Sequence, residues 1–269
     1  MLKQRIITAL ILAPTLICAI FLLPNHWFAL FLALPVLIGA NEWANLMGFE
    51  QESARLPFVI TTGILISACY WLALKFVVPL AMLWWLGALL LVRAYPQRVD
   101  LWSGKAAMFM IGLLILVPAW LALVMLQGQE NGPYWVLYVM LLVWGADTGA
   151  YFVGRRFGKT KLAPTVSPGK SIAGVVGGLL TTFFIALGVA LNTSAAVNVG
   201  LLAFLVVSMI AVFASVLGDL AESMFKRYRG IKDSSNLLPG HGGILDRIDS
   251  VTAAAPAFVG CMYLLDGVI

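Results

Sequence analysis

Long apolar runs separated by short polar segments make up most of the chain. Each run is long enough for a helix across a hydrocarbon core of roughly 30 Å, which takes about 20 residues. None alternates with the period of two expected for a barrel strand. The pattern predicts nine membrane-spanning helices, at residues 6–24, 28–48, 57–74, 76–92, 106–126, 134–153, 173–192, 199–222 and 250–268. The division at Lys75 is the weakest, because two apolar runs meet there without a proper loop.

The eighth of these spans carries a regular set of polar positions. Ser215, Asp219, Glu222, Ser223 and Lys226 follow one another at intervals of three or four residues, so they share one face of a helix. Ionisable side chains at membrane depth are costly and usually belong to a site or a water-filled cavity. We therefore expect this polar stripe to line a cavity and to run out of the bilayer into the loop that follows.

Two other spans carry acidic residues. Asp147, Tyr151 and Arg155 make a shorter stripe at intervals of four in and after the sixth span. Glu42 lies near the end of the second span, in "GANEWANLMGF". The alternative for each of these acids is a contact between helices or a position in the interface beyond the hydrocarbon, and for Glu42 this is the preferred interpretation.

Composition supports the membrane assignment. Hydrophobic residues make up 62% of the chain and charged residues 11%, and the mean hydropathy is +0.98, outside the range of soluble domains. We expect an all-α polytopic integral membrane protein with one membrane domain, in which residues 1–105 supply N-terminal helices and residues 106–269 carry the catalytic loops. For the first apolar run the alternative is a cleavable signal peptide, but no small-residue cleavage site follows "FLLPNHW".

The distribution of basic residues predicts the orientation. With the N-terminus in the cytoplasm, every Lys and Arg of the 17 except Lys75 falls in a cytoplasmic segment, as the positive-inside rule requires. The pI of about 9.2 suits anionic headgroups or an anionic substrate, and nucleic acid is not an expected partner. Cys18, Cys69 and Cys261 lie inside predicted spans without metal-ligand spacing, so neither disulfides nor a zinc site is expected.

One cytoplasmic loop, "GRRFGKTKLAPTVSPGKS" at residues 154–171, combines five basic residues with glycine, proline and hydroxyl residues. Lys159, Ser167 and Lys170 are expected to contact phosphate groups. The Gly-Lys-Ser of this loop is not a Walker A motif, because Pro164 stands where the first glycine belongs and no strand precedes it.

The second polar loop is "KRYRGIKDSSNLLPGHGGILDRID" at residues 226–249. Its glycines Gly240, Gly242 and Gly243 let backbone N–H groups approach an anion closely. Asp246 and Asp249 share one face if a helix begins there, and together they can hold a hard cation such as Mg²⁺. His241 is read first as a hydrogen-bonding or phosphate-contacting residue. The loop also supplies positive charge for phosphate oxygens, from Lys226, Arg227, Lys232 and Arg247.

Such a combination is typical of phosphoryl or nucleotidyl transfer, where catalysis is mainly positioning and charge neutralisation. A transporter for a phosphorylated solute is one alternative, although no internal repeat is visible. A structural scaffold would not concentrate acids and bases in two loops. A CTP-dependent lipid kinase, or a cytidylyltransferase acting on another lipid phosphate, is the nearer alternative.

Many positions of the second loop carry a resemblance to a known family. The chain resembles the signature of the phosphatidate cytidylyltransferase (CDP-diacylglycerol synthase) family at Ser223, Phe225, Lys226, Arg227, Lys232, Asp233, Ser235, Leu238, Pro239, His241, Gly242, Gly243, Ile244, Asp246, Arg247, Ile248 and Asp249. The segments "GDLAESMFKR" and "DTGAYFVGRRFG", together with "SPGKS", are also similar to that family. Ala173 departs from it, because a glutamate or glutamine is expected there.

This resemblance implies transfer of CMP from CTP to the phosphate of phosphatidic acid, with release of pyrophosphate and formation of CDP-diacylglycerol. It also implies a Mg²⁺ requirement, with a second cation left open, and a homodimer in a bacterial inner membrane with the active site facing the cytoplasm. Gly174 and Gly178 form a GxxxG in the seventh span, which permits close helix packing, for example between two copies.

We assign the candidate residues on this basis. The expected catalytic residues are Asp219, Lys226, Arg227, Asp246, Arg247 and Asp249, of which Asp219, Asp246 and Asp249 are the expected Mg²⁺ ligands. The expected substrate-binding residues are Asp147, Lys159, Ser167, Lys170, Ser223, Lys232, His241, Gly242 and Gly243.

Overall fold

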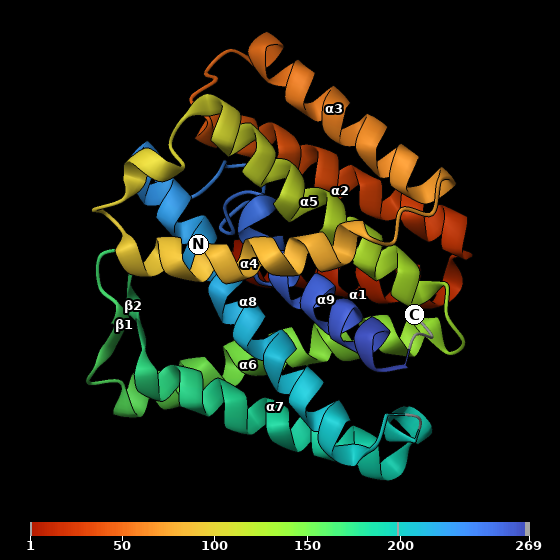
Figure 1. Ribbon diagram of the computed structural model, residues 1–269. Coiled ribbons are helices and arrows are strands. Elements are labelled where there is room, and N and C mark those ends of the chain that lie inside the picture. Colours follow the sequence, from red (N-terminus) through yellow and green to blue (C-terminus); the bar gives the residue numbers. More distant parts are fainter. Residues whose placement is uncertain (1, 198, 267–269) are drawn as a thin grey trace.

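A computed structural model describes residues 2–197 and 199–266 of the chain. It is a helical bundle with one small hairpin at one end (Figure 1). The helices of the described part are α1 (Leu2–Leu22), α2 (Asn25–Leu46), α3 (Glu52–Trp71), α4 (Val77–Ala94), α5 (Lys105–Gln127), α6 (Gly132–Phe157), α7 (Ile172–Asn192), α8 (Leu201–Arg229) and α9 (Leu245–Asp266), with short 3-10 turns at Val99–Leu101 and Ser194–Ala196. Strands β1 (Lys161–Ala163) and β2 (Ser167–Ser171) pair antiparallel.

Each predicted span corresponds to one of these helices. Eight of the described helices, α2 to α9, are long and apolar enough to cross a membrane, and the apolar part of α1, Ile6–Leu22, is shorter. The division at Lys75 is confirmed, because α3 ends at Trp71 and α4 begins at Val77. Three boundaries are wrong by five residues or more: α3 begins at Glu52 instead of 57, α8 continues to Arg229 instead of ending near 222, and α9 begins at Leu245 instead of 250.

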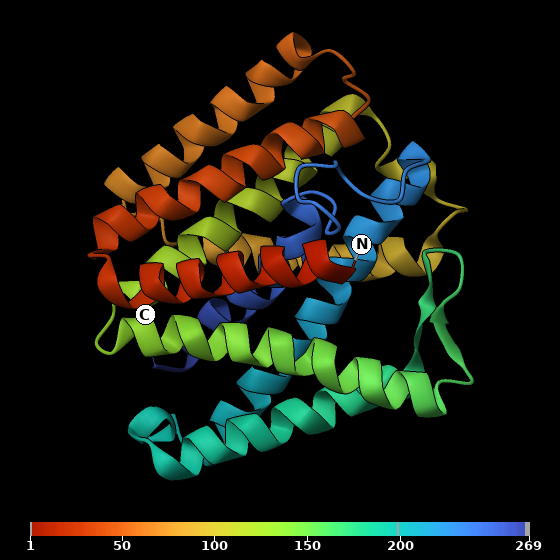
Figure 2. The same ribbon diagram turned by 180° about the vertical axis from the view of Figure 1, so that it is seen from behind.

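Helix α9 lies in the middle of the bundle (Figure 1) and packs against α8, α5, α4, α6 and α2. Helices α6 and α7 lie side by side at one edge, α3 lies at the opposite edge, and α8 crosses between them (Figures 1 and 2). The hairpin β1–β2 projects from the same end as the C-terminal end of α6 and the start of α7. Both basic loops therefore lie at one end of the bundle, as predicted.

The GxxxG motif of α7 packs within the chain. A Cβ atom at Gly178 would lie 2.8 Å from the carbonyl oxygen of Ala146, and one at Gly174 would lie 3.1 Å from that of Ala150. Both carbonyls belong to α6, so the two glycines let α6 and α7 approach closely. The GxxxG face of α7, which could have packed against a second copy of the chain, is therefore covered by α6.

A second close approach joins α8 to α9 at Gly218, where a Cβ atom would collide with the carbonyl oxygen of Asp249. Gly218→Ala is therefore expected to lower the stability of the folded protein by about 1–3 kcal/mol, as overpacking of a tight contact does. The thermal unfolding midpoint of the purified protein in detergent measures the effect. Gly87→Ala in α4 is the matched control, because no atom lies within 4 Å of the added methyl group. Equal midpoints for the two variants would contradict the packing described here.

Candidate functional site

The segment 154–171 forms a hairpin that is fixed to α8. Helix α6 ends at Phe157, β1 and β2 follow, and Ser171 then begins α7 as its N-cap, with the Gly174 N–H donating to its Oγ at 3.1 Å. Val166, at the turn of the hairpin, is fully buried, and its carbonyl accepts a hydrogen bond from Arg227 Nε at 3.2 Å. The "SPGKS" sequence is thus a strand of an antiparallel hairpin and does not form the loop of a Walker A motif, which agrees with the rejection of that motif from the sequence.

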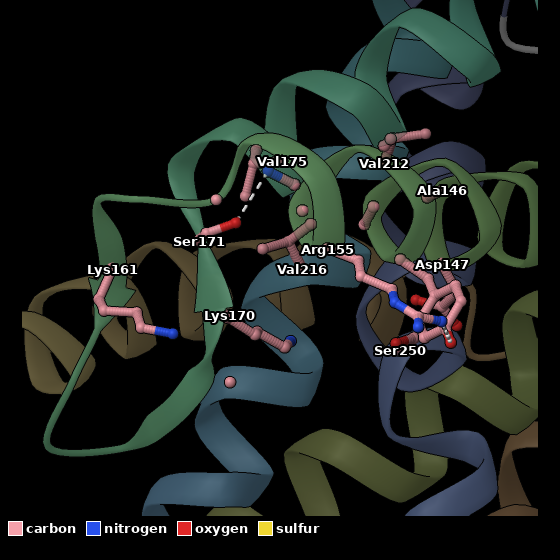
Figure 3. A pocket seen from close by; sticks show the side chains of 17 residues that line it. Ala146, Asp147, Arg155, Lys161, Lys170, Ser171, Val175, Val212, Val216 and Ser250 are labelled. Atoms are coloured by element: carbon pink, nitrogen blue, oxygen red, sulfur yellow. Dashed lines mark hydrogen bonds between the residues drawn. The ribbon is translucent and has the colours of Figure 1, made fainter.

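Lys170 is the hairpin residue that reaches the helices. Its side chain extends from β2 toward α8 in Figure 3, and its Nζ lies 2.5 Å from Asp219 Oδ2. The other oxygen of Asp219 accepts from Ser223 Oγ at 3.3 Å, one turn further along α8. The structure therefore joins three predicted site residues from two separate segments.

A cavity of about 560 Å³ opens beside this ion pair, between the hairpin and helices α6 to α9 (Figure 3). Its polar lining includes the predicted stripe of α6, Asp147, Tyr151 and Arg155, in which Arg155 donates to the Tyr151 hydroxyl at 3.1 Å. The remaining polar side chains are those of Lys161, Lys170, Ser171 and Ser250. Val175, Val212 and Val216 form an apolar wall. One cavity thus presents cations, hydroxyls and an aliphatic surface together.

Acidic residues from three helices surround the same region. Asp147 of α6 interacts electrostatically with Asp219 of α8 and with Lys170 and Arg247. Asp249 of α9 interacts with Asp219, Lys226 and Lys170. Arg247 and Asp249 lie in the first part of α9, which begins at Leu245, so Asp246 and Asp249 do share one helix.

Deeper in the bundle, Lys226 joins two carboxylates. Its Nζ lies 2.9 Å from Glu222 Oε1 and 2.5 Å from Asp246 Oδ1, and all three residues are buried. The second oxygen of Asp246, Oδ2, accepts from the backbone N–H groups of Ser234 and Gly243 and from Ser234 Oγ, at 2.7 to 2.9 Å. Lys226 and Asp246, both predicted to be catalytic, are thus engaged with protein groups on every side.

Glu42 completes this arrangement from α2. Its carboxylate accepts hydrogen bonds from Ser234 Oγ and Ser235 Oγ and from the N–H groups of Ile244 and Leu245. The sequence favoured a structural contact for Glu42. That agrees with its burial, but the sequence did not indicate which groups it contacts. Ser234 also was not among the predicted residues. The signal that pointed to Glu42 was its position, since it is the one acidic residue of α2.

The remaining predicted residues lie around this centre. Arg227 bonds to the hairpin and to the carbonyl of Ile231. Gly242 has a φ of +83°, which favours glycine, and closes a tight turn with Leu238. His241 packs with its Nδ1 buried and without a hydrogen-bond partner in the described chain. Lys159 and Lys232 are exposed and Ser167 is half-buried, all at the loop end of the bundle.

The carboxylates fit a hard cation only in part. Within residues 2–197 and 199–266 no three His, Cys, Asp or Glu side chains are grouped closely enough to hold a metal ion. Asp219 of α8 and Asp249 of α9 nevertheless interact electrostatically, and the ammonium group of Lys170 lies against Asp219. Oxygen ligands of this kind suit Mg²⁺. The Mg²⁺ site formed by Asp219, Asp246 and Asp249 stays a prediction. Of the three, Asp246 is the residue whose two carboxylate oxygens both contact protein groups.

Comparison with known proteins agrees with this chemistry. The chain matches the cytidylyltransferase family over residues 3–265. It is similar to a phosphatidate cytidylyltransferase of Pseudomonas aeruginosa, at 51% identity over 265 residues that cover 98% of this chain and 97% of the relative. A phosphatidate cytidylyltransferase of Haemophilus influenzae is 42% identical over 283 residues, covering 96% of this chain and 97% of the relative. With nearly its whole length matched, the chain belongs to the cytidylyltransferase family.

Proposed function

We propose that this multi-pass membrane protein transfers CMP from CTP to phosphatidic acid, giving CDP-diacylglycerol and pyrophosphate. The observation that carries the proposal is the cavity beside the Lys170–Asp219 pair, where basic side chains meet an apolar wall. An aliphatic surface suits an acyl chain, and lysine and arginine suit phosphate oxygens. Membership of the cytidylyltransferase family supports the nucleotide, and similarity to the phosphatidate cytidylyltransferases of Pseudomonas aeruginosa and Haemophilus influenzae supports the lipid substrate.

The reaction requires little covalent chemistry from the protein. An oxygen of the phosphatidate phosphate, already anionic at neutral pH, attacks the α-phosphorus of CTP, and the bond from that phosphorus to the bridging oxygen breaks, so that pyrophosphate leaves. The main obstacle is repulsion between two anionic substrates, and positioning with charge neutralisation overcomes it. Lys161, Lys170 and Arg155 line the cavity and supply positive charge to the phosphates.

Asp219 and Asp249 are the residues that would hold a Mg²⁺ ion, which, when bound, neutralises phosphate charge during the transfer. Asp219 is paired with Lys170 in this structure. The two acids would supply carboxylate oxygens to the ion, while Lys226 holds Asp246 and Glu222 through its two ion pairs.

The direct test is a product assay with the purified protein, phosphatidic acid and CTP labelled in its α-phosphate or in its cytosine. We expect labelled CDP-diacylglycerol and stoichiometric pyrophosphate. Formation of CDP with a newly phosphorylated lipid would identify a lipid kinase instead. Absence of any CTP-dependent product would leave a transporter or scaffold as the function.

The orientation in the membrane is part of the proposal. Because basic segments face the cytoplasm, the hairpin and the 226–249 loop should lie on the cytoplasmic side of a bacterial inner membrane, and Lys75 on the other side. In a variant without Cys18, Cys69 and Cys261, an impermeant maleimide should label Lys75→Cys in intact cells. The exposed positions Thr160→Cys and Asn236→Cys should react only after permeabilisation. Labelling of either loop position in intact cells would contradict the orientation.

We also propose that the protein is a homodimer, as the family resemblance implies. Light scattering of the detergent-solubilised protein measures the protein mass of the complex. A mass near that of one 29.1 kDa chain would contradict this part of the proposal.

A further inference from the structure

We propose that Glu42 of α2 is a positioning residue for the reaction, whose carboxylate fixes the turn at residues 234–245 and the first turn of α9. The inference rests on the proposed function, because the residues it positions are those assigned to CMP transfer. Glu42 lies 192 to 203 residues away from its partners in the sequence, in a part of the chain where we assigned no site residue.

The hydrogen bonds of Glu42 are arranged in two equal pairs. Oε1 accepts from Ser235 Oγ at 2.6 Å and from the Ile244 N–H at 3.1 Å. Oε2 accepts from Ser234 Oγ at 3.0 Å and from the Leu245 N–H at 2.7 Å. Each oxygen therefore lies within hydrogen-bond distance of one hydroxyl and one backbone N–H group, and because the N–H groups can only donate, both oxygens must be acceptors.

The start of α9 needs such a partner. The first N–H groups of a helix have no acceptor within the helix, and an anion at this end is favoured by the helix dipole. Ile244 and Leu245 stand at that start, and Glu42, only 3% exposed, satisfies their N–H groups in place of water. Gly243 makes the approach possible, since a Cβ atom there would lie 2.5 and 2.6 Å from the two oxygens of Glu42.

The position of Glu42 is itself fixed by its neighbour in the sequence. Trp43 is fully buried, donates from Nε1 to the carbonyl of Met108 at 2.9 Å, and packs edge-on against Phe225 of α8 with ring centroids 4.9 Å apart. Its ring occupies the space beside Gly112 of α5, where a Cβ atom would collide with it. Trp43 therefore fixes α2 against α5 and α8. Through its hydrogen bonds, Glu42 connects this fixed part of α2 to the turn at residues 234–245.

From Glu42 the contacts lead directly to the reacting end of α9. Ser234 Oγ lies within hydrogen-bond distance of both Glu42 Oε2 and Asp246 Oδ2, and its single proton serves one of them at a time. Asp246 in turn is paired with Lys226, and Asp249 follows one helical turn later. A shift of this turn would move Asp249 relative to Asp219, and displacement by about 1 Å can cost about a hundredfold in rate when catalysis depends on position.

Glu42→Gln separates this role from simple packing. Glutamine has the same shape, but whichever way its amide is turned, its NH₂ group faces the N–H of Ile244 or of Leu245. Glu42→Asp is shorter yet keeps two acceptor oxygens. We expect kcat to fall by more than tenfold in Glu42→Gln and by less in Glu42→Asp, with amide hydrogen exchange at residues 244 and 245 accelerated most in Glu42→Gln. Glu50→Gln, an exposed acid just after α2, is the matched control and should keep the wild-type kcat and exchange.

A wild-type kcat in Glu42→Gln would overturn the inference. A greater loss of kcat in Glu42→Asp than in Glu42→Gln would also overturn it, because a residue that only packs should keep more activity when its replacement has the same shape. If Glu42→Gln does not accumulate, Ser235→Ala removes one of the four hydrogen bonds and is expected to lower kcat several-fold with faster exchange at these amides. Wild-type behaviour of Ser235→Ala would then overturn it. A wild-type protein that makes no CDP-lipid would refute the proposed function, whereas the exchange measurement tests the Glu42 contacts without any substrate.

Discussion

Asp219→Asn and Asp249→Asn are each expected to reduce the rate of CMP transfer by at least about a hundredfold, the usual scale for loss of one preorganised electrostatic group. Asparagine keeps the size of aspartate, but it removes the charge and replaces one acceptor oxygen with an NH₂ group. Asp219 would lose its ion pair with Lys170, and both variants would lose a ligand for the cation. The initial rate with labelled CTP at saturating phosphatidic acid measures the effect.

Asp100→Asn is the control for this pair, because Asp100 is an exposed acid in the short turn between α4 and α5. It should keep the wild-type rate. Near wild-type rates in both Asp219→Asn and Asp249→Asn at ordinary Mg²⁺ concentrations would place the metal elsewhere. Asp147 and Glu222 would then be the next pair to replace.

Lys226→Met is expected to lower the stability of the folded protein by about 3–5 kcal/mol, since removing one partner of a buried ion pair leaves an uncompensated charge. Here two carboxylates, Glu222 and Asp246, lose the ammonium group between them. Methionine has a similar length, so the change removes charge with little change in volume. The unfolding midpoint in detergent and the yield of monodisperse protein report the loss.

Arg229→Met provides the comparison within the same helix. Arg229 pairs with Glu50, whose side chain is 81% exposed, and exposed ion pairs contribute at most about 1 kcal/mol. We expect its midpoint to stay close to that of the wild type. If Lys226→Met unfolds no earlier than Arg229→Met, then the buried contacts of Lys226 do not stabilise the fold.

The helices and the polar stripes could be predicted because their signals are local. Apolar length gives the spans, and intervals of three and four residues placed Asp147, Tyr151 and Arg155 on one cavity wall. The helix ends were predicted less well, because α8 and α9 extend into polar sequence where hydropathy gives no signal. The hairpin was missed for a related reason, since β1 has only three residues and the five residues of β2, SPGKS, include proline and glycine.

The partners of the site residues depend on contacts between distant segments. The sequence grouped Lys226 with the phosphate-binding residues, whereas the fold surrounds it with Glu222 and Asp246. Helical spacing brings Glu222 next to Lys226, but it does not reveal that Asp246 arrives from α9. The contacts of Glu42 with the turn are of the same kind, because no local pattern in either segment indicates the other.

Helix α8 has 29 residues, a length of about 43 Å at 1.5 Å per residue, whereas the hydrocarbon core is about 30 Å thick. Its polar stripe begins at Ser215, roughly halfway along, so we expect the carboxylates to lie where acyl chains give way to headgroups. A helix longer than the membrane adjusts by tilting or by deforming the bilayer locally. The acyl-chain length of the host membrane therefore helps to set how deep the reacting groups lie, and with it how readily a nucleotide from water and a headgroup from the bilayer meet.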